Sequence, residues 1–256
     1  MTALGFKAST SPEELEGETA RLLPTMMVLA MLAALLATAA GVSDAAPPPG
    51  CWEPAAPKLD LTLPAGMPPH PRLRLNDSAL LRLNATIQSD PVAQAYYKSM
   101  YDRGVAMLSD PPVACAEGGQ MLEASRAVLV MQYTLGMLRR LTDEDRFAKR
   151  ATSELLHVTT NCSTWDPFGL ALAEMTHAVG IGYDWLYHSL TTTERATIVA
   201  GVTALGFDEA LKDYAKGEFW TNCTFNWGVV TNGGLTVGAL AFLEDAPNAS
   251  VRATFK

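Results

Sequence analysis

The sequence predicts an all-α protein, an incomplete α/α toroid of antiparallel helical hairpins. Apolar residues recur at helical spacing from residue 70 onward, and no segment alternates for long between polar and apolar residues as a strand would. Short connectors between the helical segments favour antiparallel neighbours. Several segments are apolar around most of their circumference, whereas each helix of a plain four-helix bundle carries one apolar stripe. We expect an incomplete ring because the chain reaches Lys256 soon after its last predicted helix begins.

Capping residues predict where the first two helices begin. Asn76 is suited to cap a leucine-containing helix, because its side chain can accept a hydrogen bond from a first-turn N–H group. Asp90 and Pro91 supply a cap and a first-turn proline for the next helix, over 92–108.

The later helices are predicted over 121–141, 142–157, 168–190, 191–210 and beyond, and 233–243. The helix from 142 has an acidic first turn, which suits a helix N-terminus. The helix over 168–190 is apolar over most of its circumference, so we expect it to be buried on more than one side. Thr191 and Glu194 form a capping box for the helix that follows.

The N-terminal part contains an apolar run over 22–42 with small residues near its end. This run is typical of a secretory signal peptide and predicts an extracellular protein. A single membrane anchor is the alternative, since about 20 apolar residues suffice to span a bilayer. The predicted organisation is a tail with signal or anchor over 1–45, a Pro-rich linker over 46–69 and the helical domain over 70–256.

Sequons and cysteines also fit passage through a secretory route. The five N-x-S/T sequons predict glycosylation at Asn76, Asn84, Asn161, Asn222 and Asn248. The four cysteines allow up to two disulfides with three connectivities, and they are Cys51, Cys115, Cys162 and Cys223.

The composition excludes some function classes. The net charge of −8 argues against a nucleic-acid partner, which would require a basic stripe. It does not argue against an acidic polysaccharide, because positive groups can gather locally in a cleft. The sequence has no phosphate-binding loop, dinucleotide fingerprint or metal-ligand cluster, so we expect no cofactor and no metal.

Three blocks of the sequence occur in an order known from one enzyme family. They are His70-Pro71-Arg72-Leu73, the segment over 165–190, and the segment over 226–240, which begins Asn-Trp-Gly-Val-Val-Thr-Asn-Gly-Gly. With these blocks the chain resembles the helical domain of heparinase II/III-type polysaccharide lyases over about residues 70–247. The resemblance implies β-elimination at a uronic acid of a heparin-like or alginate-like polysaccharide. Uronyl C5-epimerases of the dermatan sulfate epimerase type share the fold and the proton abstraction, and they remain an alternative.

The resemblance also implies roles for particular residues. Such chemistry needs a donor to the uronate carboxylate, a base for the C5 proton and an acid for the leaving oxygen. Asn226 matches the family asparagine that engages the carboxylate. Trp227 follows it where some relatives carry histidine, and the family tyrosine and C-terminal β-sandwich would lie beyond Lys256. We therefore expect a truncated member of the family, and the resemblance alone does not establish that it turns over substrate.

The helix over 168–190 contains three supporting candidates. His177 and Asp184 are seven residues apart, which nearly restores the same helical face and suggests that the two side chains pair. Tyr183 and His188 lie close by in the sequence. The alternative is that these residues are satisfied members of the core, since the surrounding helix is strongly apolar.

Aromatic and basic side chains supply candidate sugar contacts. Trp165, Trp220 and Trp227, with Phe225, can cover the apolar faces of sugar rings or can fill the core. Arg72, Arg74 and Lys216 are candidate anion partners, and Asn232 is predicted to be a turn or cap residue. A glycoside hydrolase would need paired carboxylates, for which Asp166, Glu174 and Asp184 are available. A non-catalytic secreted carbohydrate-binding protein is the remaining alternative.

Overall fold

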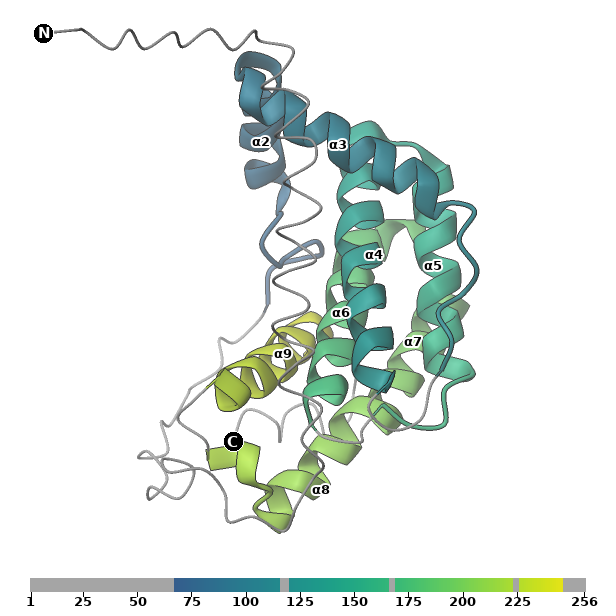
Figure 1. Ribbon diagram of the computed structural model, residues 1–256, viewed down its shortest axis with the longest axis vertical. Helices are drawn as coiled ribbons and strands as arrows, with labels where there is room; N and C mark the ends of the chain where they lie inside the picture. The colour runs from purple at the N-terminus through teal and green to yellow at the C-terminus, as the bar shows by residue number, and fades with distance from the viewer. Residues whose placement is uncertain (1–66, 116–119, 166–168, 223–225, 246–256) are drawn as a thin grey trace, which may run out of the picture. The chain divides into compact units, whose positions relative to one another are not determined.

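The computed structural model describes residues 67–115, 120–165, 169–222 and 226–245, all within the unit Pro48–Lys256. These residues form helices joined by turns and loops, and no strand occurs among them (Figure 1). The predicted all-α class is confirmed. The predicted signal or anchor segment and most of the Pro-rich linker lie outside these ranges. Within the ranges, no helix is long and apolar enough to cross a membrane.

The first two helices begin where their caps predict. Helix α2 (Asp77–Ser89) follows Asn76, whose Oδ1 accepts a hydrogen bond from the N–H of Ala79 at 3.0 Å. Helix α3 (Pro91–Met107) follows Asp90, whose Oδ1 accepts from the N–H of Val92 at 2.7 Å.

Helices α4 (Gln120–Thr142) and α5 (Asp145–Thr160) form a hairpin with a two-residue connection. Helix α3 lies across this connection (Figure 1). The hydroxyl of Tyr101 on α3 donates to Glu144 at 3.1 Å and accepts from Arg146 at 2.7 Å. These contacts hold α3 on the end of the hairpin.

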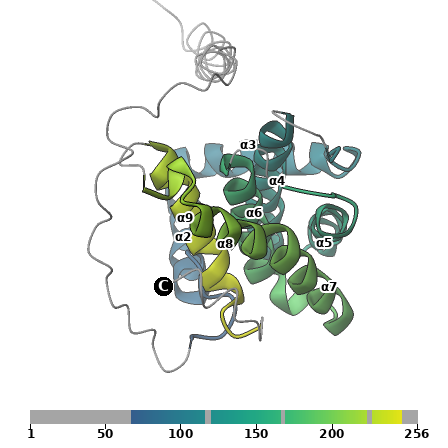
Figure 2. The same cartoon turned by 90° about the horizontal axis from the view of Figure 1, so that it is seen from below.

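Helix α6 (Leu170–Leu186) is the central helix of the fold and contacts both α4 and α9 along its length (Figures 1 and 2). Fourteen of its 17 residues are buried, as its apolar circumference predicts. It ends in the short helix η1 (Tyr187–Ser189).

The next helix is interrupted, where the sequence predicts one continuous helix. Helix α7 (Thr192–Val202) begins with the predicted capping box. A π-helical segment, η2 (Thr203–Phe207), then separates it from α8 (Asp208–Lys216). Gly206 in this segment lies against Thr176 of α6, so that a Cβ at position 206 would come within 2.8 Å of the threonine hydroxyl. The irregular turn thus lies where the backbone is in close contact with α6.

The last helix, α9 (Asn226–Phe242), begins seven residues before the predicted start at Gly233 and follows the short helix η3 (Phe219–Asn222). The glycine pair was interpreted as a helix start, but it lies inside the helix. Gly234 and Gly238 of α9 and Gly180 of α6 allow α9 to lie directly on α6. A Cβ at Gly234 would come within 2.5 Å of the Ala173 carbonyl oxygen, and one at Gly180 within 2.8 Å of the Gly238 Cα.

Helices α4, α6 and α9 run in the same direction. Along α4 and α6, Ser125 contacts Ala171 and Gly136 contacts Trp185. Along α9 and α6, Gly234 contacts Ala173 and the later Gly238 contacts the later Gly180, so these two helices also run in the same direction. Helices α5 and α7, which contact each other, lie in a second layer (Figure 2). From α4 to α7 the chain therefore alternates between two layers of helices.

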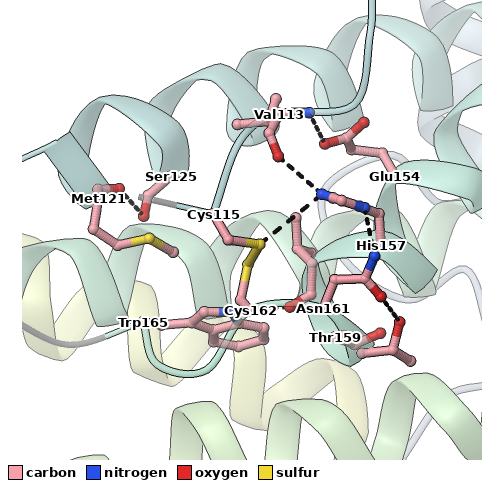
Figure 3. The surroundings of a disulfide bond; sticks show 12 residues. Val113, Cys115, Met121, Ser125, Glu154, His157, Thr159, Asn161, Cys162 and Trp165 are labelled. Atoms are coloured by element: carbon pink, nitrogen blue, oxygen red, sulfur yellow. Dashed lines mark hydrogen bonds between the residues drawn. A yellow bond between two sulfur atoms is a disulfide. The ribbon is translucent and has the colours of Figure 1, made fainter. Parts of the chain in front are cut away.

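A disulfide closes the α4–α5 hairpin. Cys115, which follows α3, is bonded to Cys162, which follows α5 (Figure 3). Nearby, His157 on α5 contacts the carbonyl oxygen of Val113 at 3.0 Å. Cys51 and Cys223 lie outside the described residues.

Candidate functional site

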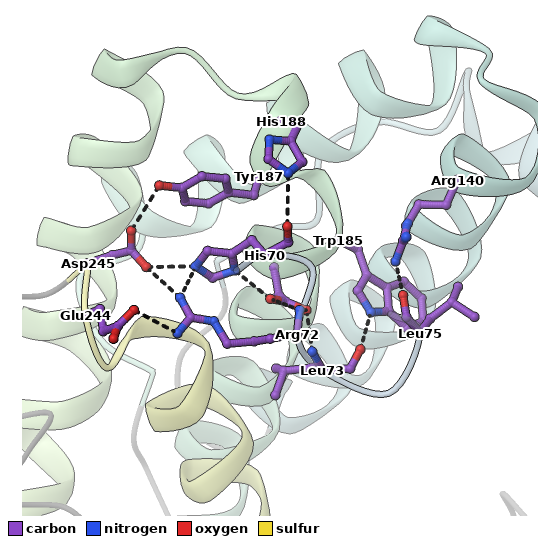
Figure 4. Close-up of polar contacts among 11 residues, drawn as sticks. His70, Arg72, Leu73, Leu75, Arg140, Trp185, Tyr187, His188, Glu244 and Asp245 are labelled. Carbon is purple, nitrogen blue, oxygen red and sulfur yellow. Dashed lines mark hydrogen bonds and ion pairs between the residues drawn. The ribbon is translucent and has the colours of Figure 1, made fainter. Parts of the chain in front are cut away.

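A buried polar cluster joins the C-terminal ends of α6 and α9 to the segment before α2. We call His70, Arg72, Asp184 and Asp245 the clasp (Figure 4). The His70 Nδ1 contacts Asp184 at 2.6 Å and its Nε2 contacts Asp245 at 2.8 Å. The fully buried Asp184 also accepts from the backbone N–H groups of Arg72, at 3.0 Å, and Leu73, at 2.9 Å.

The clasp favours the cationic form of His70. Burial lowers the pKa of His70, but hydrogen bonds to the two carboxylates outweigh this effect and raise the pKa above its ordinary value. Both ring N–H groups then donate to carboxylates, and Arg72 pairs with Asp245 at 3.2 Å. Tyr187 stacks on the imidazole with ring centroids 4.1 Å apart. Because both ring nitrogens contact carboxylates within the protein, we assign His70 a structural role.

The predicted pairing of His177 with Asp184 is wrong. Seven residues along a helix separate two side chains by about 10 Å, too far for a hydrogen bond. Asp184 pairs with His70, and His188 contacts the backbone carbonyl of His70 at 3.0 Å. His177 instead contacts the hydroxyl of Tyr133 on α4 through its Nε2 at 2.8 Å.

The Tyr133–His177 pair joins a proton donor to a proton acceptor. Burial lowers the pKa of His177, and the positive charge of Arg74 lowers it further, so the imidazole is neutral at neutral pH. Burial raises the pKa of Tyr133, against the effect of Arg74, so its hydroxyl stays protonated. The tyrosine O–H therefore donates to Nε2. Both side chains are half-buried rather than sealed in the core.

The pair lies on a surface to which three parallel helices contribute one stripe each. We call this surface the open face. Val237 of α9 packs against a hydrophobic cluster that includes Ile181 of α6. Ile181 lies one turn after His177. The α9 stripe that contains Val237 therefore lies on the same side of α6 as His177. The stripes consist of Glu123, Arg126, Val130 and Tyr133 on α4, Leu170, Glu174 and His177 on α6, and Asn226, Val230, Gly233 and Val237 on α9.

Asn226 is on the open face but does not reach His177. It is the first residue of α9, is exposed, and makes no side-chain hydrogen bond to another described residue. The two helices touch where Gly234 of α9 meets Ala173 of α6. Asn226 lies eight residues before Gly234 on α9, and His177 lies four residues after Ala173 on α6. At 1.5 Å per residue the two are separated by about 18 Å along the parallel helices. The carboxamide and the Tyr133–His177 pair cannot contact the same sugar ring.

Arg74 is held close to the Tyr133–His177 pair by its neighbours in the chain. Leu73 is fixed by Asp184, and the carbonyl oxygen of Leu75 accepts from Arg140. Between them, Arg74 adopts a left-handed conformation with φ of 47° and is exposed. Such a conformation costs a non-glycine residue about 1–3 kcal/mol, and residues of this kind gather at functional sites.

Tyr183 and two of the predicted sugar-binding tryptophans are core residues. Tyr183 packs on Phe242 at 4.4 Å between ring centroids, and burial raises its pKa. It borders a pocket of about 690 Å³ that is lined mainly by α7. The interpretation of Trp165 and Trp220 as sugar contacts is wrong for this conformation, because both are fully buried. The indole N–H of Trp165 donates to the carbonyl oxygen of Val158 at 3.1 Å.

The remaining residues that the sequence suggests for substrate contacts or turns differ in exposure and in hydrogen bonding. Trp227 is half-buried, with its ring 5.0 Å from Phe219. Asn232 is neither a turn nor a cap, since it lies inside α9, where it accepts from Tyr214 and donates to the carbonyl oxygen of Gly228 at 2.8 Å. Lys216 is exposed and lies 3.9 Å from Asp213. Asp166 and Phe225 lie outside the described residues.

Four of the five sequon asparagines, Asn76, Asn84, Asn161 and Asn222, are exposed. Asn248 lies outside the described residues. The exposed side chains are accessible to modification.

Sequence reasoning missed Tyr133 altogether. It lies in the middle of a mainly apolar helix with no polar motif around it, and its partner is 44 residues away. Within the described ranges, no group of three or more His, Cys, Asp or Glu side chains is arranged to hold a metal ion. No protein-family model and no curated protein matches the chain.

Proposed function

We propose that this protein is a polysaccharide lyase that cleaves uronate-containing chains by β-elimination on the open face. The observation that carries the proposal is the Tyr133–His177 pair, a protonated hydroxyl and a neutral imidazole 2.8 Å apart on a partly exposed surface. The two layers of helices and the common direction of α4, α6 and α9 support the α/α toroid expected for this enzyme class.

In this mechanism His177 is the base and Tyr133 is the acid. When the substrate O4 takes over the hydrogen bond of the tyrosine O–H, the Nε2 lone pair is free to accept the C5 proton. The C5 electron pair forms the C4–C5 double bond, the C4–O4 bond breaks, and the leaving oxygen takes the tyrosine proton. The proton on His177 then returns to Tyr133. A base and an acid in direct contact serve the same side of the ring, so the elimination is syn.

Arg74 is the proposed partner of the substrate carboxylate. Removing the C5 proton builds negative charge on the uronate, and a nearby cation stabilises that charge in the transition state. Arg74 is exposed, and its charge lowers the pKa of both His177 and Tyr133. Asn226 contacts a different sugar unit of the same polysaccharide.

The disulfide and the four exposed sequon asparagines support a secreted protein, because disulfides persist in oxidising compartments and glycosylation occurs in the secretory pathway. The adjacency of base and acid favours the lyase over an epimerase, which must return a proton to the opposite side of C5. A hydrolase is less well supported, because Asp184 is buried in the clasp and Glu174 is paired with Arg126.

The test is the absorbance of the unsaturated uronate product when the full chain is incubated with polyuronates and heparin-like polymers. We expect His177→Gln and Tyr133→Phe each to reduce turnover by about 10²–10⁴-fold, the usual contribution of a positioned acid or base. His157→Gln on α5 and Tyr96→Phe on α3 are matched controls and should retain activity. Deuterium entry at C5 from solvent without new absorbance would show an epimerase instead, and full activity of both open-face variants would refute the assigned roles.

A further inference from the structure

Arg126 on α4 has two different carboxylate partners on the open face. Its Nε and Nη2 face Glu174 of α6, with the shortest contact at 3.1 Å. Its Nη1 faces Glu123, one turn earlier on the same helix, at 3.5 Å. The guanidinium is therefore held along one edge by a neighbouring helix and contacted along another by a residue of its own helix.

The two partners differ in how firmly they are held. The side chain of Glu174 is 13% exposed, whereas that of Glu123 is 67% exposed. Burial raises the pKa of Glu174, and Arg126 opposes this effect by stabilising the carboxylate. Exposed pairs such as Arg126–Glu123 contribute little to stability and exchange readily with solvent or another anion. Glu174 therefore fixes the orientation of the guanidinium, while the Nη1 edge is available.

The distance from Arg126 to the proposed reaction centre matches the length of a disaccharide. It precedes Tyr133 by seven residues, two helical turns, so both side chains lie on the same stripe of α4 about 10 Å apart. That distance is about the length of a disaccharide. In a polyuronate, and equally in a polymer that alternates uronate with amino sugar, the sugar one disaccharide away is again a uronate.

We propose that Arg126 is a second anion-binding position, which takes the carboxylate of the uronate one disaccharide away from the sugar that reacts. The substrate carboxylate replaces Glu123 at Nη1, while Glu174 stays in place as the positioning residue. The inference rests on the proposed function, because it uses Tyr133 and His177 as the reaction centre. It makes Arg126 a determinant of substrate length and charge, without a part in the chemical step.

The test compares two variants with effects of opposite sign, measured on the full chain with an unsulfated uronate hexasaccharide. By calorimetry and steady-state kinetics, Arg126→Gln should weaken binding and raise KM about tenfold with kcat unchanged, since it removes a charge-assisted hydrogen bond. Glu123→Gln should tighten binding about two- to threefold, because it removes a competing partner from an exposed pair. An unsulfated uronate disaccharide, too short to reach both positions, should not distinguish the variants from the wild type.

Arg103→Gln on α3 is the matched control, because it makes the same change of charge at an exposed position on another helix. Glu123 is exposed, so its replacement tests the inference even where loss of Arg126 disturbs folding. If the wild type binds and cleaves the hexasaccharide while both open-face variants behave like Arg103→Gln, the role of Arg126 is refuted and the proposed function stands. If the wild type neither binds nor cleaves acidic oligosaccharides, the proposed function itself fails.

Discussion

The clasp and the open face each contain a histidine in a short hydrogen bond, yet their surroundings give the two histidines opposite properties. His70 lies between two carboxylates, which favour its cation and occupy both of its nitrogens. His177 contacts a neutral hydroxyl near a cation, which favours its neutral form and leaves it the acceptor in its bond to Tyr133. The partners of a histidine therefore decide which protonation state it favours.

The two regions are also connected. The clasp fixes the segment 70–75, and that segment holds Arg74 close to the Tyr133–His177 pair. A change in the clasp should consequently affect both stability and the open face, whereas a change in the open face should leave the clasp intact.

The largest expected effect comes from breaking the clasp. Asp184→Ala should lower the free energy of unfolding by about 3–5 kcal/mol, because it leaves the cation of His70 and two backbone N–H groups buried without their acceptor. Urea denaturation gives this value. Asp102→Ala, which removes an exposed carboxylate that pairs with Lys98, should cost about 0.5 kcal/mol or less.

Removing a hydrogen bond of the histidine on the open face should lower the free energy of unfolding far less. Tyr133→Phe removes one half-buried hydrogen bond and should lower the free energy of unfolding by about 1 kcal/mol. A loss as large as that of Asp184→Ala would contradict the distinction between a structural and a reactive histidine.

A change in stability that is again smaller than that of Asp184→Ala tests the helix contacts under the open face. Gly180→Ala should destabilise the protein by about 1–3 kcal/mol, because the added Cβ would come within 2.8 Å of the Gly238 backbone. Gly233→Ala is the control on α9, where no atom lies within 4 Å of the added Cβ, and it should stabilise the helix by about 0.5–1 kcal/mol. Equal effects of the two substitutions in thermal unfolding would contradict the direct contact of α6 with α9.

The last prediction concerns the smallest change, the difference between the pKa values of the two histidines. The raised pKa of His70 means that its stabilising contribution is complete below pH 6.5 and is lost as the pH rises through the folded-state pKa. The lowered pKa of His177 has the opposite sign, so stability is lost as the pH falls from 6.5 toward its folded-state pKa. NMR titration of the ring protons, assigned with His70→Gln and His177→Gln, should show His177 titrating at lower pH than His70. The reverse order would overturn the electrostatic comparison.

The sequence predicts the parts of the fold that depend on neighbouring residues. The caps at Asn76, Asp90 and Thr191 are confirmed. They could be predicted because a cap and the N–H group that it satisfies are only two or three residues apart. The start of α9 was predicted wrongly at Gly233. A glycine pair has the same local signature in a turn and in a helix that lies against another backbone.

The candidate site was harder to predict, because its pairs form between distant residues. His70 and Asp184 are 114 residues apart, and Tyr133 and His177 are 44 apart. The helical period correctly placed His177 and Asp184 on a similar face, but it could not show that the segment 70–75 supplies the partner of Asp184. Trp165 and Trp220 are predicted sugar contacts, but tertiary packing, which the sequence does not reveal, buries both.

The glycine contact between α6 and α9 has a consequence for substrate selection. Where two backbones touch, no layer of side chains lies between them that could be compressed or repacked, so the width of this side of the surface is invariant. On the other side, α4 presents long side chains such as Glu123 and Arg126, whose replacement alters the available space without moving a helix. For the proposed lyase, adaptation to a bulkier or differently charged sugar should therefore proceed through substitutions on α4.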